Sequence, residues 1–185
     1  RILIIGPTYD NFRAVVAAAG ANAKFYNSGD ESLQIDIAKL NIDLQLINPK
    51  VVYLVNPNNP TGHQYSKEAI ELLLRSHPNI LFIVDEAYFE FSGYTCSTFV
   101  SLFDNLIVSR TFSKALGLAS FRIGYCLAHE NIISSLNKVR NAKNVSHLAQ
   151  VAAFAVLKDL DPINEYVSEV VEQRESFIEF LQQFS

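Results

Sequence analysis

The sequence predicts an α/β fold built on a largely parallel sheet, and three observations support this. Short apolar runs recur up to residue 128, helical patterns separate them, and the links between them are short. Strands that alternate with helices in this way usually form a parallel sheet covered by helices. The runs are mostly continuous rather than alternating, which is expected of strands buried on both faces.

The elements follow in a regular order. Strands are predicted at residues 2–5, 23–26, 51–55, 80–84, 106–108 and 123–128. Helices are predicted between them at residues 9–20, 32–46, 66–76 and 98–103. Beyond residue 129 the apolar spacing is helical only, first over 132–139 and then over 148–156. Asp161-Pro162 then begins a long helix, as N-cap and first-turn proline.

Composition excludes several classes of protein. A chain of 185 residues, 49% of them apolar, can bury a full core as one domain. The net charge of −4, without a basic stripe, gives no sign of a nucleic-acid partner. No apolar run approaches the roughly 20 residues that cross a membrane, so no membrane partner is expected. None of the histidines has zinc-ligand spacing, so we expect no metal.

Cellular location and chain boundaries are interpreted from smaller signals. Cys96 and Cys126 have no motif around them, so we interpret them as reduced thiols. We also find no secretion signal in the sequence. We therefore expect a cytoplasmic protein. Because a strand begins directly after Arg1 and a helical pattern runs almost to Ser185, we interpret the chain as part of a longer one.

Polar motifs follow the apolar runs. The segment NPNNPTG occupies residues 56–62, DEAY occupies 85–88, and SRTFSKALGLASFRIGY occupies 109–125. In open α/β sheets ligands bind outside the carboxyl ends of the strands, so the three segments are expected to gather at one sheet edge. Together they supply a reactive amine, an anchored carboxylate, a phenol, an amide and a phosphate-binding cluster. These are the groups needed to hold pyridoxal phosphate (PLP).

The order and spacing of these segments resemble the large domain of fold-type I PLP-dependent aminotransferases, and within them the histidinol-phosphate aminotransferase group. The resemblance implies a three-layer α-β-α fold with a mostly parallel sheet. It assigns residues 1–160 to the PLP-binding large domain, incomplete at its N-terminus, and 161–185 to a long helix that leads towards a C-terminal small domain outside the chain. It also implies that the full-length protein is a homodimer.

The resemblance implies the catalytic roles as well. Lys114 would form the Schiff base with the cofactor aldehyde and then act as general acid and base, which requires a pKa lowered by burial or by a neighbouring cation. Asp85 would pair with the pyridine nitrogen and keep it protonated. Tyr88 and Asn59 would donate hydrogen bonds to the ring hydroxyl oxygen. Taken singly, a strand-end Asp is often a helix cap, and an Asn-Pro segment is often a plain turn.

Four further residues complete the predicted cofactor site. Thr111, Ser113 and Arg122 would bind the phosphate through two hydroxyls and a guanidinium. Arg122 begins an apolar run, where an unpaired charge would be costly, so it favours a buried anion. Tyr9 would stack on the cofactor ring, although it could equally cover the sheet edge. Hydroxyl residues before a helix are commonly caps, so Thr111 and Ser113 are each ambiguous alone.

The expected activity is transfer of an amino group between an amino acid, with glutamate as the expected donor, and a 2-oxo acid or phosphorylated ketone, with ping-pong kinetics. Residues 141–143 read Asn-Ala-Lys where histidinol-phosphate enzymes carry a Pro-rich stretch, a departure that bears on the substrate. The family's N-terminal phosphate loop and its substrate-carboxylate arginine would lie outside the chain, which alone should be poorly active. Three alternatives stay open: a threonine-phosphate decarboxylase, a PLP-binding sensor domain of a transcription regulator, and an α/β domain that has lost the chemistry.

Overall fold

The computed structural model describes residues 1–27 and 33–184, which divide into two compact units. The first, called the sheet unit, comprises Arg1–Ala87, Thr95–Arg110 and Tyr125–Arg140. The second, called the helical unit, comprises Tyr88–Tyr94, Thr111–Gly124 and Asn141–Ser185. The chain crosses between the units several times, so each unit is assembled from separate stretches of sequence.

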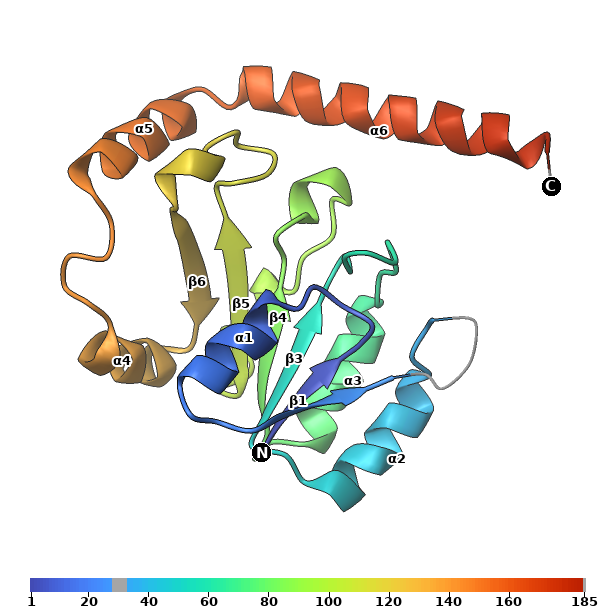
Figure 1. Ribbon diagram of the computed structural model, residues 1–185, viewed down its shortest axis with the longest axis vertical. Coiled ribbons are helices and arrows are strands. Elements are labelled where there is room, and N and C mark those ends of the chain that lie inside the picture. Colours follow the sequence, from blue (N-terminus) through green and yellow to red (C-terminus); the bar gives the residue numbers. More distant parts are fainter. Residues whose placement is uncertain (28–32, 185) are drawn as a thin grey trace. The chain divides into compact units, whose positions relative to one another are not determined.

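A six-stranded sheet in the order β2-β1-β3-β4-β5-β6 forms the centre of the fold (Figure 1). Its strands are β1 Ile2–Ile5, β2 Ala23–Tyr26, β3 Val51–Val55, β4 Leu81–Asp85, β5 Leu106–Thr111 and β6 Gly124–Ala128. The pairs β1–β2, β1–β3, β3–β4 and β4–β5 are parallel, whereas β6 points opposite to β5. The mostly parallel α/β fold predicted from the apolar runs is therefore confirmed.

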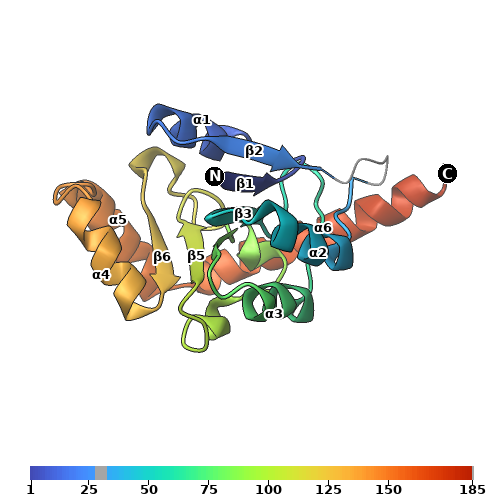
Figure 2. The same ribbon diagram turned by 90° about the horizontal axis from the view of Figure 1, so that it is seen from below.

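Helices flank the sheet within the sheet unit. They are α1 Asn11–Ala18, α2 Ile37–Ile47, α3 Lys67–Ser76 and α4 Glu130–Val139. Helix α1 lies on one face of the sheet, and α2 and α3 lie on the opposite face (Figure 2). The Asp36 carboxylate accepts from the amides of Ala38 and Lys39, and the Ser66 hydroxyl from that of Ala69. These N-caps satisfy amides that the first helical turn leaves unpaired.

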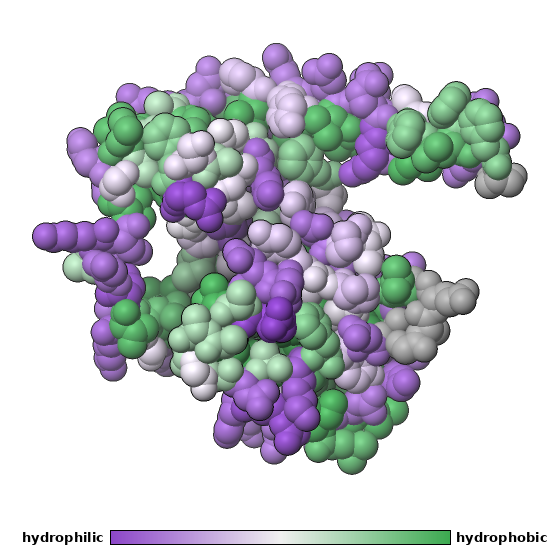
Figure 3. Space-filling view, in the orientation of Figure 1, coloured by the Kyte–Doolittle hydropathy of each residue, from purple (hydrophilic) through white to green (hydrophobic). Residues whose placement is uncertain are grey.

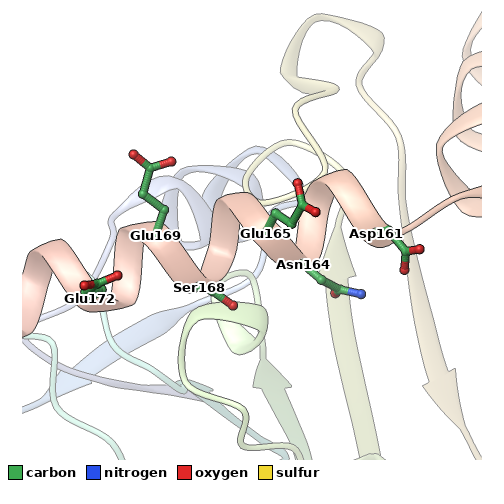
Figure 4. A pocket seen from close by; sticks show the side chains of 6 residues that line it. All are labelled: Asp161, Asn164, Glu165, Ser168, Glu169 and Glu172. Atoms are coloured by element: carbon green, nitrogen blue, oxygen red, sulfur yellow. The ribbon is translucent and has the colours of Figure 1, made fainter.

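The helical unit contains α5 His147–Lys158 and α6 Asp161–Gln182. Phe112, Leu116 and Ala153 form its buried cluster, against which Val156 of α5 and Ile163 of α6 pack. A shallow polar depression on α6 is lined entirely by that helix; its residues are Asp161, Asn164, Glu165, Ser168, Glu169 and Glu172 (Figure 4). Towards its C-terminus α6 exposes the apolar residues Phe177, Ile178, Phe180 and Leu181, and hydrophobic surface appears at its end in Figure 3.

Burial differs between inner and edge strands. Ile4, Leu54, Val84 and Leu106, one from each inner strand, are at most 1% exposed. In the two edge strands, β2 and β6, by contrast, no residue is buried, and Tyr125 of β6 is 40% exposed. Burial on both faces was predicted for the apolar runs in general and is wrong for these edge strands, each of which has a neighbouring strand on one side only. Among the described residues no helix has the length and apolarity needed to span a membrane.

The predicted helix at 98–103 is also wrong. The segment forms only a short 3-10 turn, η2 Ser97–Phe99, followed by a further turn in which the amide of Phe103 donates to the carbonyl of Phe99 at 3.0 Å. Phe99 and Phe103 meet edge to face with centroids 5.9 Å apart, so a single turn satisfies the helical spacing. The predicted start of the second helix at residue 32 lies outside the described residues, and the helix begins after its Asp36 cap.

Candidate active site

The loops after β1 and β3 leave the sheet at a topological switch point. From β1 the chain moves outwards to β2 and then returns to the other side of β1 as β3, and ligands of open α/β sheets bind at such points. Asn58 ties the two loops together: its amide donates to the Pro7 carbonyl at 2.9 Å and to the Thr61 hydroxyl at 2.7 Å. The Thr8 hydroxyl donates back to the Asn58 side-chain oxygen at 2.6 Å.

Two predicted cofactor residues lie on these loops. Asn59 directly follows Asn58 and is half-buried, whereas Tyr9 follows Thr8 and is 57% exposed. The return of the longer loop is fixed by Asn56, which is fully buried and accepts the Tyr65 amide at 2.9 Å through its side-chain oxygen. The loop that carries Asn59 is therefore more than the plain turn that its sequence allows.

Asp85 is the last residue of β4, between β3 and β5. Its Oδ2 accepts a hydrogen bond from the Tyr53 hydroxyl at 2.6 Å, and its Oδ1 accepts the Ala87 amide at 3.1 Å. Burial raises the pKa of the Asp85 carboxyl, while the hydrogen bonds from Tyr53, Ala87 and Ser109 act in the opposite direction. The result is a carboxylate held by neutral donors at the carboxyl end of the sheet.

Glu86, the next residue, has a different environment. It is fully buried, and its carboxylate pairs with Arg110 through Nε at 3.0 Å and through a second nitrogen at 2.9 Å. The Thr95 hydroxyl and the Cys96 amide donate to the same carboxylate. Because its charge is matched by a guanidinium and its oxygens are occupied, we assign Glu86 a structural role.

The helical unit carries the remaining predicted residues, most of them in its segment Thr111–Gly124, called the lysine loop. Within the loop the amide of Leu118 donates to the Phe112 carbonyl at 2.8 Å, and Gly117 adopts a φ of 70°, which favours glycine. Nζ of Lys114 lies 5.2 Å from the centroid of the Tyr88 ring. The structure therefore brings these two predicted catalytic residues together.

The phosphate-binding candidates are arranged less simply. Thr111 and Ser113 are half-buried, and the Thr111 hydroxyl accepts the Ser113 amide at 3.1 Å, so it also has the local role of a turn-stabilising group. Arg122 caps the 3-10 turn η3 Ala119–Phe121 in the left-handed region, with a φ of 52°. One of its guanidinium nitrogens donates to the Ala119 carbonyl at 3.4 Å.

Two expectations about burial are corrected. Lys114 is exposed, so burial, one of the two conditions expected for this amine, is not observed. Arg122 is exposed too, and it precedes β6 rather than standing inside an apolar strand. Both residues lie on the solvent-facing side of a loop whose anchors are Phe112 and Leu116, because the apolar residues of the loop enter the buried cluster and leave the charged ones outside.

Sequence reasoning missed several residues that support the site. Tyr53 contacts Asp85 although the two are 32 residues apart, and Asn58 bridges to Pro7 across 51 residues. A signal for Tyr53 was present, since a tyrosine in an otherwise aliphatic run requires a partner for its hydroxyl. Asn58 stood inside the recognised NPNNPTG segment, where only its neighbour Asn59 was given a role.

The sheet order, the carboxylate that closes β4 and the lysine loop after β5 are features of the fold-type I transferase fold. The profile of the aminotransferase class I and II family matches residues 1–184, and the chain belongs to this family.

Individual relatives agree with this assignment. The chain is 44% identical to a dihydroxyacetone phosphate transaminase of Campylobacter jejuni, over 98% of this chain and 49% of that protein. It is 33% identical to a histidinol-phosphate aminotransferase of Ruminiclostridium cellulolyticum, over 99% of this chain and 51% of the relative. The crystal structure of the histidinol-phosphate aminotransferase of Sinorhizobium meliloti in complex with PLP superposes with a TM-score of 0.83 at 29% identity, over 94% of this chain and 48% of the other.

The chain spans about half the length of these relatives. Its donor set fits PLP, the cofactor of this family. Asp85 offers a carboxylate to a protonated ring nitrogen, Lys114 an amine to an aldehyde, and Thr111, Ser113 and Arg122 offer donors to a phosphate. These groups are divided between the sheet unit, which holds Asp85, and the helical unit, which holds the other four.

Proposed function

We propose that the protein is a PLP-dependent aminotransferase that transfers an amino group from an amino acid to a phosphorylated ketone. The proposal is carried by two observations, a carboxylate that ends β4 in the sheet unit and an exposed amine on the lysine loop of the helical unit. Asp85 closes β4 with neutral donors around it, and Lys114 follows β5 on a loop anchored by an apolar cluster. Membership of the class I and II aminotransferase family supports the same reading.

Each side chain has a proposed task. Asp85 accepts a hydrogen bond from the pyridine nitrogen, Asn59 and Tyr88 donate to the ring hydroxyl oxygen, and Tyr9 covers the ring. Thr111, Ser113 and Arg122 hold the phosphate. When bound, PLP supplies an electron sink for the charge left on the substrate carbon. Lys114 holds the cofactor through its aldehyde and, once the substrate has displaced it, moves the proton that leaves that carbon.

The proposed acceptor class comes from the relatives. Dihydroxyacetone phosphate is a phosphorylated ketone, and so is the ketone that corresponds to histidinol phosphate. Residues Asn141–Lys143, where the sequence departs from the histidinol-phosphate pattern, form a turn in which the Asn141 side chain accepts the Lys143 amide at 2.9 Å. We therefore propose dihydroxyacetone phosphate as the first acceptor to test, with glutamate as donor.

The cellular location, the oligomeric state and the domain arrangement are part of the same proposal. We propose a cytoplasmic homodimeric enzyme of biosynthetic amino-group transfer that acts on small molecules. Residues 1–160 would belong to its PLP-binding large domain, and α6 would lead towards a small domain. The long helix predicted from Asp161-Pro162 is present as α6, with the proline in its first turn but with Leu160 rather than Asp161 as N-cap, and its presence supports this division.

Cofactor binding is tested by titrating the purified protein with PLP and following its visible absorption. After borohydride reduction, peptide mass mapping should place a pyridoxyl group on Lys114, and the Lys114→Ala variant should lose both band and adduct. The exposed Lys50, changed to alanine, is the matched control and should leave them intact. A band that survives in Lys114→Ala would contradict the proposal.

The reaction is tested on the full-length protein, incubated with PLP, glutamate and dihydroxyacetone phosphate, beside the ketone of histidinol phosphate. The expected result is 2-oxoglutarate together with the amine of the phosphorylated ketone. Release of carbon dioxide from threonine phosphate without amino transfer would assign the protein to the decarboxylases instead. Binding of PLP without turnover of any amino donor would favour the sensor.

A further inference from the structure

We propose that Tyr53 is a positioning residue for the cofactor: its hydroxyl holds the Asp85 carboxylate ionised and in one orientation, ready to accept a hydrogen bond from a protonated pyridine nitrogen. This inference rests on the proposed function. It concerns a residue of β3 outside the sequence segments NPNNPTG, DEAY and SRTFSKALGLASFRIGY.

The register of the sheet places Tyr53 and Asp85 on one face. Val55 of β3 pairs with Asp85 of β4, and Tyr53 stands two residues before Val55, so alternation along the strands directs all three to the same side. The distance from the Tyr53 hydroxyl to Oδ2 is 2.6 Å, short enough for a charge-assisted hydrogen bond.

The tyrosine ring itself is fixed in place. Tyr53 is 4% exposed, packs with Ile4 and Val55, and stacks on Phe12 with centroids 3.8 Å apart and an interplanar angle of 7°. Such a ring cannot swing away when the carboxylate changes partner. Phenylalanine would fill the same space, so the hydroxyl is needed for its contact with Asp85 rather than for packing.

The electrostatics agree with this geometry. Burial raises the pKa of Asp85, and the Tyr53 hydroxyl, the Ala87 amide and the Ser109 hydroxyl of β5 counteract that effect. Burial and the Asp85 charge raise the pKa of Tyr53 far above its usual range, with a smaller contribution from Tyr9 in the loop after β1. The phenol therefore keeps its proton and remains a donor throughout the working pH range.

The orientation follows from how the two carboxylate oxygens are shared. Oδ2 is held by Tyr53 and Oδ1 by the Ala87 amide, so the carboxylate plane is fixed from two directions. Each carboxylate oxygen can accept more than one hydrogen bond, so capacity remains for the cofactor. Without the Tyr53 donor, Oδ2 would lose the bond that opposes its burial.

The test uses Tyr53→Phe in the intact protein and reads the Asp85 carboxyl directly, by carbon-13 NMR titration without PLP, with Asp85→Asn for assignment. A hydrogen bond to a charged group contributes about 1.5–3 kcal/mol, so the titration midpoint should rise by about one to two pH units. The acidic midpoint in the pH dependence of PLP affinity should rise by the same amount. Fluorotyrosine at position 53, a stronger donor that preserves packing, should move the midpoint the other way.

The matched control is Tyr26→Phe. The Tyr26 hydroxyl donates to Oδ2 of Asp43 at 2.6 Å, the same chemistry on the edge strand β2, which β1 and β3 separate from β4, so this variant should leave the Asp85 midpoint unchanged. An Asp85 midpoint that does not move in either Tyr53 variant overturns the inference. A wild-type protein that never binds PLP overturns the proposed function and with it the role of Tyr53, and the apo titration tells the two failures apart.

Discussion

The buried ion pair between Glu86 and Arg110 allows a stability effect to be worked out from the structure. The Glu86 side chain is 0% exposed and that of Arg110 11%. Changing Glu86 to Gln preserves size but leaves the guanidinium without a counter-charge, and removing one partner of a buried pair costs about 3–5 kcal/mol. Because Arg110 still donates to the Thr95 hydroxyl and can donate to Tyr125, we expect the lower end, about 3 kcal/mol.

The measurement is urea unfolding at neutral pH, with thermal unfolding beside it. For a chain of this size about 3 kcal/mol corresponds to a fall in Tm of roughly 6–12 °C. The matched control is Glu71→Gln, which breaks the exposed pair with Arg75 on α3 and should cost about 1 kcal/mol or less. Equal losses in Glu86→Gln and Glu71→Gln would refute the reasoning, since burial would then have no effect on the cost.

Two further variants address the candidate site. Burial raises the pKa of Asp85 in the folded protein, so the proton on this carboxyl contributes stability that is lost as the pH rises through that folded pKa. Without PLP, Asp85→Asn should therefore be more stable than wild type at neutral pH. The difference in unfolding free energy between the two proteins should become smaller on acidification. A difference that grows on acidification would contradict the raised pKa of Asp85. Asn58→Ala removes the bonds to Thr8, Pro7 and Thr61, and should lower the unfolding free energy by about 1–3 kcal/mol and weaken PLP binding in titrations, whereas unchanged binding would separate the loop from the cofactor.

The strands could be predicted because each is a short, mostly apolar run between helical patterns, and the inner strands must be apolar on both faces. The runs at 2–5, 23–26 and 51–55 coincide with β1, β2 and β3, and β4 is displaced by one residue. β5 extends three residues beyond its apolar run, to Thr111, because backbone pairing continues where the side chains become polar. Apolar spacing reports side-chain burial, so it cannot locate a strand end that is defined by hydrogen bonds.

The prediction of a helix at 98–103 was wrong for a related reason. Phe99 and Phe103 have the spacing of one helical turn, and a segment this short provides no second turn to distinguish a helix from a 3-10 turn. The longer helices were predictable because several turns repeat the pattern. Ser66 and Ser146 cap α3 and α5, whereas Asp161, the cap named from the sequence, is the first residue of α6 and its N-cap is Leu160.

The candidate site was only partly predictable. Lys114, Asp85 and Asn59 were found because they lie within recognisable segments of sequence. Their supporting partners were not, because a hydrogen bond such as that from Tyr53 to Asp85 depends on strand order and register. The exposure of Lys114 could not be predicted either, because it depends on which residues of the loop enter the buried cluster: Phe112 and Leu116 do, and Lys114 does not.

The fold gives the two adjacent carboxylates of the segment DEAY different environments, and only one of them is suited to bind the cofactor. Consecutive residues at a strand end point to opposite faces, so Asp85 meets Tyr53 while Glu86 meets Arg110. Glu86 is neutralised by a fixed cation. Within the described part of the chain Asp85 has hydroxyl and amide donors but no ion pair. A half-buried carboxylate held by neutral donors gains more from a cationic ligand than one already paired with a guanidinium, which makes Asp85, rather than Glu86, the proposed partner for a protonated pyridine nitrogen.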